Sequence, residues 1–270
     1  MARDFIEVAV STDVGNVRQF NEDSVATDAE RGLAILADGM GGHRAGEVAG
    51  RMATEIILST LQADVGEFRS NTGPHSASRV VNESINRANS AIFSAAASHP
   101  HYQGMGTTLA LVLFHDNRVT LAHLGDSRIY RLRASRLNLL TRDDSLLRDQ
   151  IELGLIAAAD AAESHNRSLV TRALGIEASV SAHVRDEEAL PGDVFLLCSD
   201  GLNDLVDDDD IELIVDSLKS NLPLAANHLV QTAKDNGGYD NVSVILVRVQ
   251  KPFPASSQAG WMKRVFGWLR

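Results

Sequence analysis

Several aspartates in this chain lie beside turn-forming residues, a pattern that can build a metal site. They are Asp23, Asp38, Asp126, Asp200 and Asp240. An isolated buried charge is very costly, so carboxylates that converge at strand ends would share compensation from a hard divalent cation. Two such ions, about 3.5–4 Å apart, can activate water and bind a phosphoryl group. Taken singly, each position is equally an ordinary turn, and the sequence by itself does not show that the positions converge.

The overall composition narrows the classes of protein. Hydrophobic residues make up 44% of the 270 residues, enough for a sizeable core, and the formal net charge is −11. This acidic balance argues against nucleic-acid binding, which needs a basic face. Cys198 is the only cysteine, so a disulfide framework is excluded. With no secretory signal and no apolar run long enough for a membrane span, the sequence predicts a cytoplasmic protein.

The elements that must position these aspartates follow from the spacing of apolar residues. Period-two alternation and short apolar runs predict strands, and helical spacing predicts helices. The predicted strands cover residues 5–14, 32–38, 107–114, 119–124, 128–133, 136–140, 179–185, 193–198 and 241–249. The predicted helices cover residues 43–62, 76–97, 143–153, 208–219 and 224–236. Strand pairs followed by separate runs of helices favour an α+β architecture.

The acidic positions also lie within short motifs, and these resemble the metal-dependent protein phosphatases of type 2C in their compact bacterial form. The match spans residues 5–250. One such motif alone would be weak evidence for the family, but the presence of all of them in the family's order is a specific signal. The motifs are Asp13-x-Gly15-x-x-Arg18-x-x-Asn21-Glu22-Asp23, Ala37-Asp38-Gly39-Met40-Gly41-Gly42-His43, Gly106-Thr107-Thr108, Gly125-Asp126-Ser127-Arg128, Leu169-Val170-Thr171-Arg172-Ala173-Leu174-Gly175, Cys198-Ser199-Asp200-Gly201-Leu202 and Asp240-Asn241-Val242-Ser243.

The resemblance implies a fold and a division of the chain. The fold is a four-layer αββα sandwich, with two central antiparallel β-sheets flanked by helices and with a flap subdomain. The catalytic domain would cover residues 1–250, with the flap at about 141–175. Residues 251–270 would form a linker and a basic amphipathic tail.

The resemblance also implies a centre of two Mn²⁺ or Mg²⁺ ions. Asp38 would bridge the two ions, and the Gly39 carbonyl would ligate the second. Asp200 and Asp240 would complete the shell of the first ion.

Further acidic residues are assigned by the same resemblance. Glu22 and Asp23 would serve the second ion, directly or through water. Asp126, Asp200 and Asp204 match the positions of a third, weaker metal site near the flap.

The implied reaction is the hydrolysis of phosphoserine and phosphothreonine in proteins by metal-activated water. Arg18 corresponds to the arginine that grips the substrate phosphate, and its planar donor fork suits phosphate oxygens. Arg18 and Asp38 are therefore the predicted catalytic residues. No phosphoenzyme is needed, so Cys198 is predicted to be a buried apolar residue. The partners would be phosphorylated proteins and a Hanks-type serine/threonine kinase, and some relatives act in type VI secretion.

The sequence departs from the family's pattern at the general acid and in the flap. Many relatives outside bacteria carry a histidine where this chain has Met40, which leaves His43 or water at the metals as the proton donor. Asp143-Asp144-Ser145 replaces a common Asp-His-Ser, and these residues, with His165 and Arg167, are expected mainly to be solvated, with substrate contact as the alternative. Arg128 and Arg172 are expected to tie loops to carboxylates.

Other readings stay open beside the enzyme. One is a catalytically inactive phosphatase-fold module that binds phosphoproteins, and another is a plain metal-binding scaffold. The presence of Asp38, Asp200 and Asp240 favours activity. In a helix the tail would place Trp261, Phe266 and other apolar residues on one face opposite basic residues. Such a tail would contact a membrane surface or a partner protein, unless it folds back onto the domain.

Overall fold

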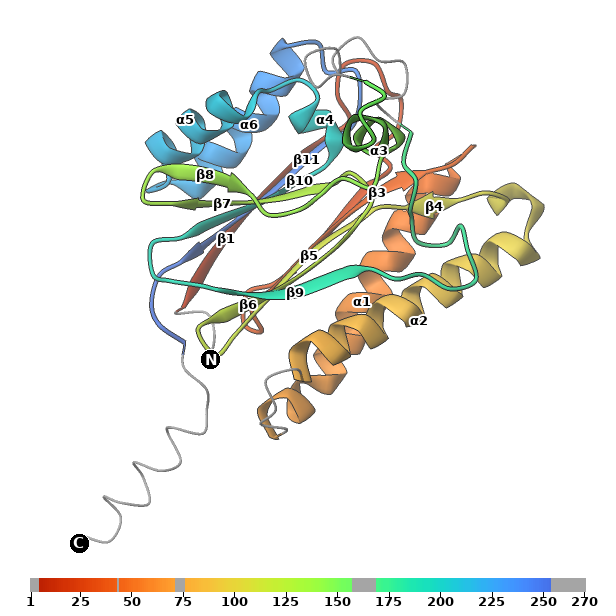
Figure 1. Cartoon of the computed structure of the whole chain (residues 1–270), viewed down its shortest axis with the longest axis horizontal. Coiled ribbons are helices and arrows are strands. Elements are labelled where there is room, and N and C mark those ends of the chain that lie inside the picture. The colour runs from red at the N-terminus through yellow and green to blue at the C-terminus, as the bar shows by residue number, and fades with distance from the viewer. Residues whose placement is uncertain (1–4, 43, 71–75, 157–168, 254–270) are drawn as a thin grey trace, which may run out of the picture.

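The computed structural model describes residues 5–42, 44–70, 76–156 and 169–253. These residues form two antiparallel sheets that pack face to face, with helices on both outer faces (Figure 1). The predicted α+β sandwich is therefore confirmed.

Each sheet is built from strands that come from separate parts of the chain, so the two sheets do not correspond to two halves of the sequence. The first sheet contains, in spatial order, β1 (Ile6–Asp13), β11 (Val242–Val249), β10 (Val194–Cys198), β7 (Arg128–Arg133) and β8 (Arg136–Leu139). The second contains β2 (Asp23–Asp28), β3 (Leu33–Met40), β5 (Leu109–His115), β6 (Arg118–Leu124) and β9 (His183–Glu188), and β4 (Gly106–Thr107) pairs with the end of β3.

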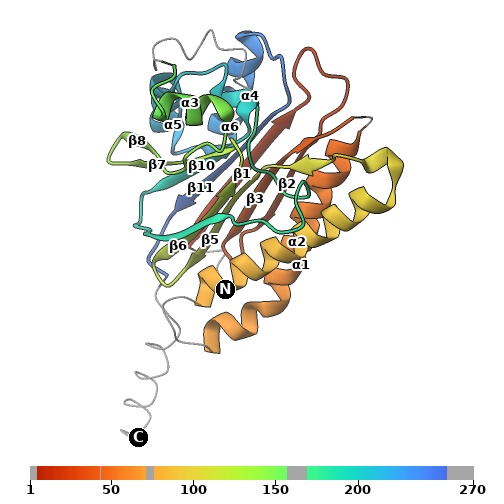
Figure 2. The same ribbon diagram turned by 45° about the vertical axis from the view of Figure 1, so that its right-hand side comes forward.

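Each outer layer consists of helices over one sheet. The second sheet is covered by α1 (Ala45–Ser70) and α2 (Ser76–Ser98), and the first by α4 (Asp200–Asn203), α5 (Asp208–Leu218) and α6 (Leu222–Asp235). Figure 2 shows these helices on opposite sides of the sandwich, with α3 (Leu146–Glu152) at one end. None of the helices in the described part of the chain has the length and apolar character of a membrane span.

Three apolar layers fill the spaces between these elements, and strand alternation divides the side chains among them. On β3, Leu33 and Ile35 face α1 and α2, whereas Ala34 and Leu36 face the other sheet. Successive side chains of a strand point to opposite faces, and both faces of β3 are covered. This double burial explains why β3 is an unbroken apolar run in the sequence.

Some element boundaries differ from the sequence predictions. The strand β2 was not predicted, because Asp23–Asp28 begins and ends with aspartate and is only partly buried. Helix α1 extends to Ser70 instead of residue 62, and β9 begins at His183 instead of residue 179. Residues 251–253 are not a free linker, since the Phe253 ring lies 6.1 Å from that of Phe114 and joins the core between the sheets. The rest of the predicted tail lies outside the described residues.

The aspartates singled out in the sequence lie together at one end of the sandwich. Asp38 is near the end of β3 and pairs in register with Asp23 on β2. Asp126 follows β6, Asp200 follows β10, and Asp240 precedes β11. Because neighbouring strands are antiparallel, these starts and ends meet at the same edge.

Candidate metal centre

The carboxylates at this edge influence one another strongly. Burial raises the pKa of Asp38 well above its usual value, and the charges of Asp23, Asp200, Asp126 and Asp240 raise it further. The pKa of Asp200 is raised in the same way, by burial and then by its acidic neighbours. The folded chain thus concentrates negative charge that water alone does not neutralise.

Individual oxygen atoms at the site lack protein partners. The Oδ1 atoms of Asp23 and Asp200 are buried and have no hydrogen-bond partner within the described structure. Burial raises the pKa of Asp23 to about 6 and that of Asp126 to about 7. Buried polar atoms in native proteins almost always have a partner, so these oxygens fit ligation of hard cations such as Mn²⁺ or Mg²⁺.

The backbone of Asp38 is held by hydroxyl groups from neighbouring strands. The Thr107 hydroxyl donates to the Asp38 carbonyl at 2.8 Å, and the Asp38 N–H donates to Thr108 Oγ1 at 3.0 Å. Thr108 Oγ1 lies 2.7 Å from Ser127 Oγ. Ser199 Oγ in turn donates to Asp23 Oδ2 at 2.9 Å. These contacts fix the backbone of Asp38 and the carboxylate of Asp23.

Gly39 allows helix α1 to approach the end of β3. A Cβ atom at Gly39 would lie 2.1 Å from the Gly46 carbonyl oxygen and 2.7 Å from that of Glu22. The Gly39 N–H donates to the Glu22 carbonyl at 3.2 Å. The glycine is therefore required by close backbone packing, in addition to its predicted role as a carbonyl ligand.

Asn241 positions the acidic loop that carries Glu22. Its Oδ1 accepts the Glu22 N–H at 2.8 Å, and its Nδ2 donates to the carbonyls of Val14 and Phe20 at 3.0 and 2.9 Å. The pKa of Glu22 is raised, first by burial. Sequence reasoning recognised Asn241 only as part of a motif and assigned it no positioning role.

Arg18 lies at the mouth of the centre. Its Nη2 donates to Asp240 Oδ2 at 2.7 Å, and the Arg18 side chain is 53% exposed. Asp240 also raises the pKa of Arg18 through this contact, and the charges of Asp200 and Glu22 add to the effect. The guanidinium is therefore accessible from solvent and directed at the predicted metal ligands.

The residues predicted for a third ion are near one another as well. The charge of Asp204, at the exposed end of α4, raises the pKa of both Asp126 and Asp200. Arg128 offsets this charge only in part: its charge lowers the pKa of Asp126, but its Nε and Nη2 are engaged with Asp143 at 3.0 and 2.7 Å. The prediction that Arg128 ties a loop to a carboxylate is confirmed.

The structure corrects the prediction for the start of the flap. Asp144 is not solvated, since its side chain is 2% exposed, and the Asp143 side chain is 15% exposed. Arg172 lies 3.6 Å from Asp144, which confirms its predicted pairing with a carboxylate. His165 and Arg167 lie outside the described residues, as does His43. Cys198 is fully buried as predicted, and burial raises its thiol pKa to about 12.

A second cluster of ligand-type side chains was not predicted. His123, Asp144 and His183 each place one ligand atom within 4.8 Å of the others. His123 and His183 are 60 positions apart in the sequence, and they meet because they are paired residues of β6 and β9. The spacing of these residues in the sequence does not predict this contact, because it depends on how the two strands pair.

Comparisons with known proteins identify the family of the chain. The family model of protein phosphatase 2C matches residues 16–232. The chain is 39% identical over 246 residues to the serine/threonine protein phosphatase PstP of Mycobacterium tuberculosis, covering 90% of this chain and 45% of that protein's length. The chain thus spans less than half of that relative.

Solved structures of protein phosphatases have a fold similar to that of this chain. The catalytic domain of PstP in complex with two manganese ions matches with a TM-score of 0.80 at 35% identity, covering 92% of this chain and 99% of that one. PppA, a regulatory component of the type VI secretion system in Pseudomonas aeruginosa, matches with a TM-score of 0.76 at 29% identity, covering 91% and 98%.

Proposed function

The chain belongs to the protein phosphatase 2C family, and from this premise we propose that it hydrolyses phosphoserine and phosphothreonine in proteins with the help of two divalent cations, Mn²⁺ or Mg²⁺. The observation that carries the proposal is the convergence of Asp23, Asp38 and Asp200, two of which present buried oxygens without partners. The proposed catalytic domain covers residues 1–250, with the flap at about 141–175.

We assign the ligands by combining the family's motifs with this geometry. Asp38 would bridge the two ions and the Gly39 carbonyl would join it. Asp200 and Asp240 would hold the first ion, and Glu22 and Asp23 the second. A third ion would bind Asp126, Asp200 and Asp204.

When bound, the cations would supply an activated water and compensate the charge of the phosphate ester. The protein's part is to orient these components. Asp38 and Asp23 are partners on paired strands; the Asp38 backbone N–H is held by the Thr108 hydroxyl, and the Asp23 carboxylate by the Ser199 hydroxyl. Arg18 contacts Asp240 in the described structure, and its solvent-facing fork would bind the phosphate oxygens once the Asp240 carboxylate serves a cation.

The biological setting is a further part of the proposal. The substrates would be phosphorylated proteins, and the opposing enzyme a Hanks-type serine/threonine kinase. The similarity to PppA supports type VI secretion as one setting. A cytoplasmic location and a contact of the tail with a membrane surface or partner protein stay predictions.

The activity is tested by hydrolysis of an aryl phosphate and of a phosphothreonine peptide, with chelator and with Mn²⁺. We expect turnover with Mn²⁺ only, and a loss of about 100-fold or more in Asp38→Asn, since one preorganised electrostatic contact contributes about that much. Asp216→Asn is the matched control, because Asp216 is a surface residue of α5 bonded to Lys219.

The competing function, an inactive module that binds phosphoproteins, gives a different result. It predicts peptide binding without metal-dependent turnover, and equal behaviour of wild type and Asp38→Asn. That outcome would contradict the proposed enzyme.

A further inference from the structure

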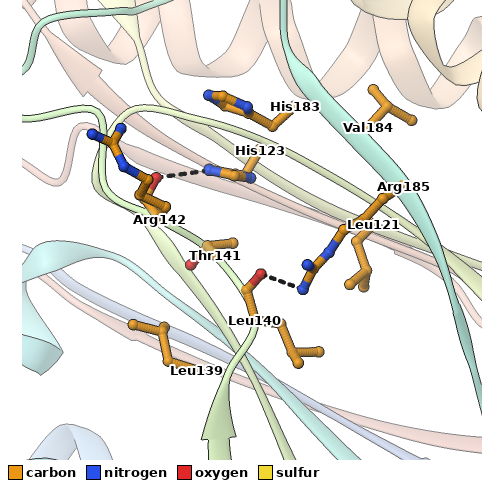
Figure 3. Close-up of a pocket in the computed structure, with 9 residues that line it drawn as sticks. All are labelled: Leu121, His123, Leu139, Leu140, Thr141, Arg142, His183, Val184 and Arg185. Atoms are coloured by element: carbon orange, nitrogen blue, oxygen red, sulfur yellow. Dashed lines mark hydrogen bonds between the residues drawn. The ribbon is translucent and has the colours of Figure 1, made fainter.

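A second metal-ligand cluster joins the start of the flap to strands β6 and β9, and it does not include the carboxylates of the main site. His123 is on β6, His183 opens β9, and Asp144 lies just before α3. The imidazole rings of His123 and His183 are stacked, with centroids 4.8 Å apart and planes inclined by 17°. Figure 3 shows the two rings lying together among the residues that line a pocket.

The hydrogen bond of His123 determines which of its nitrogens can bind a cation. His123 Nε2 lies 2.9 Å from the Arg142 carbonyl oxygen, which can only accept. Nε2 therefore carries the proton, and Nδ1 presents its lone pair. Histidines that bind metals typically donate their other N–H to a carbonyl or carboxylate in this way. Burial also lowers the pKa of His123, which favours the neutral ring.

His183 and Asp144 already face a cation. His183 Nε2 lies 3.2 Å from Asp144 Oδ1 and 3.1 Å from Arg172 Nη1, and the same Arg172 atom is 3.6 Å from Asp144 Oδ1. Since arginine can only donate, it fits between two acceptors. The Arg172 side chain is 52% exposed, so it can withdraw without leaving a buried charge of its own.

The spacing of these acceptors suits a small transition-metal ion. Ligand atoms about 2.0–2.2 Å from a tetrahedral Zn²⁺ are about 3.3–3.6 Å apart. The separation of 3.2 Å between His183 Nε2 and Asp144 Oδ1 is close to this value, and a ring nitrogen of each histidine and a carboxylate oxygen of Asp144 all lie within 4.8 Å of one another. Because the His123 and His183 rings are stacked, with planes inclined by 17°, one ring must turn before both can ligate the same ion.

We propose that His123, Asp144 and His183 form a binding site for a zinc-class transition metal, in which the ion replaces the Arg172 guanidinium. Two imidazoles and one carboxylate favour Zn²⁺, Ni²⁺ or Cu²⁺, whereas the all-oxygen site favours Mn²⁺ or Mg²⁺. The new site touches the main one, because Asp144 Oδ2 accepts the N–H of Gly125, the residue before Asp126. Its occupancy would therefore link the flap to the carboxylate edge.

The test uses Co²⁺, a coloured substitute for Zn²⁺, titrated into the full chain in excess Mg²⁺ and followed by visible absorption. The parent protein carries Asp38→Asn, which weakens the main centre. We expect one Co²⁺ per chain, with an apparent Kd raised by about 10- to 100-fold or more in His183→Gln. His228→Gln, at an exposed position on α6, is the matched control and should bind Co²⁺ as the parent does.

A second variant separates metal binding from a merely structural role. Arg172→Gln removes the competing cation and should lower the apparent Kd, although it also removes a contact of the folded protein. Asp144→Asn should weaken binding as His183→Gln does, while the amide oxygen can still accept from Gly125. Thermal unfolding without metal verifies that each variant is folded. Equal Co²⁺ binding by the parent and by both ligand variants would overturn the proposal, as would weaker binding in Arg172→Gln.

Discussion

The oxygens of Asp23 illustrate how single residues at the site are prepared for an ion. Oδ2 accepts from Ser199 at 2.9 Å, which fixes the carboxylate, and Oδ1 is buried without a partner. One oxygen is thus used for orientation and the other is left available. An unpartnered buried acceptor costs about 1–3 kcal/mol, so the metal-free site is destabilised until a cation binds.

Arg18 is the residue whose replacement should affect substrate binding most directly. We expect Arg18→Ala to raise KM for a phosphothreonine peptide by about 10- to 100-fold, since a charged hydrogen bond contributes about 1.5–3 kcal/mol. The effect on kcat should be smaller, because the contact exists in both the ground and transition states. Steady-state kinetics with saturating Mn²⁺ provide the measurement.

Two further variants define the cause of that effect. Arg18→Lys keeps the charge but loses the planar fork, and an intermediate KM is expected. Arg31→Ala is the control, because Arg31 pairs with Asp28 at the β2–β3 turn. If Arg18→Ala left KM unchanged, the assignment of Arg18 to phosphate binding would be wrong.

At the scale of elements, apolar patterning was enough to locate the buried strands but not the partly polar ones. The runs within β3 and β11 are buried on both faces and were predicted to within a few residues. Strand β2 was not predicted, because its sequence, Asp-Ser-Val-Ala-Thr-Asp, has few apolar residues. The His123–His183 contact was not predicted either, since the pairing of β6 with β9 is a tertiary property that no local sequence pattern encodes.

The junction of β3 with α1 gives a prediction about packing. Gly39→Ala would place a Cβ 2.1 Å from the Gly46 carbonyl oxygen, so the helix or the strand must shift. We expect a loss of about 1–3 kcal/mol in the free energy of unfolding, as for other overpacked sites, together with weaker Mn²⁺ binding as Asp38 moves. Urea unfolding in chelator measures the first effect, and calorimetric Mn²⁺ titration the second.

Gly42→Ala is the matched control for this junction. A Cβ at Gly42 would have no heavy atom within 4 Å, so stability and Mn²⁺ affinity should change little. Equal stability of Gly39→Ala and Gly42→Ala would show that the close approach of β3 and α1 is not required.

For the whole molecule, the buried carboxylates at the site edge lower the free energy of unfolding, and the packing of the rest of the sandwich must offset this loss. Core layers on both faces of each sheet hold the strand ends in place, and those ends carry like charges. The motif order in the sequence predicted which aspartates belong to this edge, but not their burial or the partners of their oxygens. Ser199 donates to an Asp23 oxygen, Thr108 holds the Asp38 N–H and Asn241 holds the Glu22 N–H, and these hydroxyl and amide groups carry no signal on their own.

The raised pKa values make stability depend on pH in a defined direction. Asp23 has a folded-state pKa of about 6 and Asp126 of about 7, against about 3.9 for an unfolded aspartate. The folded protein therefore binds more protons than the unfolded chain between about pH 4 and pH 7. The contribution of these groups to stability is present at acidic pH and is lost as the pH rises through that interval.

Divalent cations should reverse this loss, because they take the place of the protons. We expect Mn²⁺ to raise the Tm by several degrees more at pH 7.5 than at pH 5, since about 1 kcal/mol corresponds to about 2–4 °C for a protein of this size. Thermal unfolding with chelator and with Mn²⁺ at both pH values is the measurement.

Because other carboxylates also titrate, the informative quantity is the difference in Tm between Asp38→Asn and the wild type. In chelator at pH 7.5 the variant should be the more stable protein, since one buried charge is gone, and with Mn²⁺ the wild type should be. If both proteins gained equally from Mn²⁺ at both pH values, the ions would bind elsewhere and the buried carboxylates would not be the metal centre.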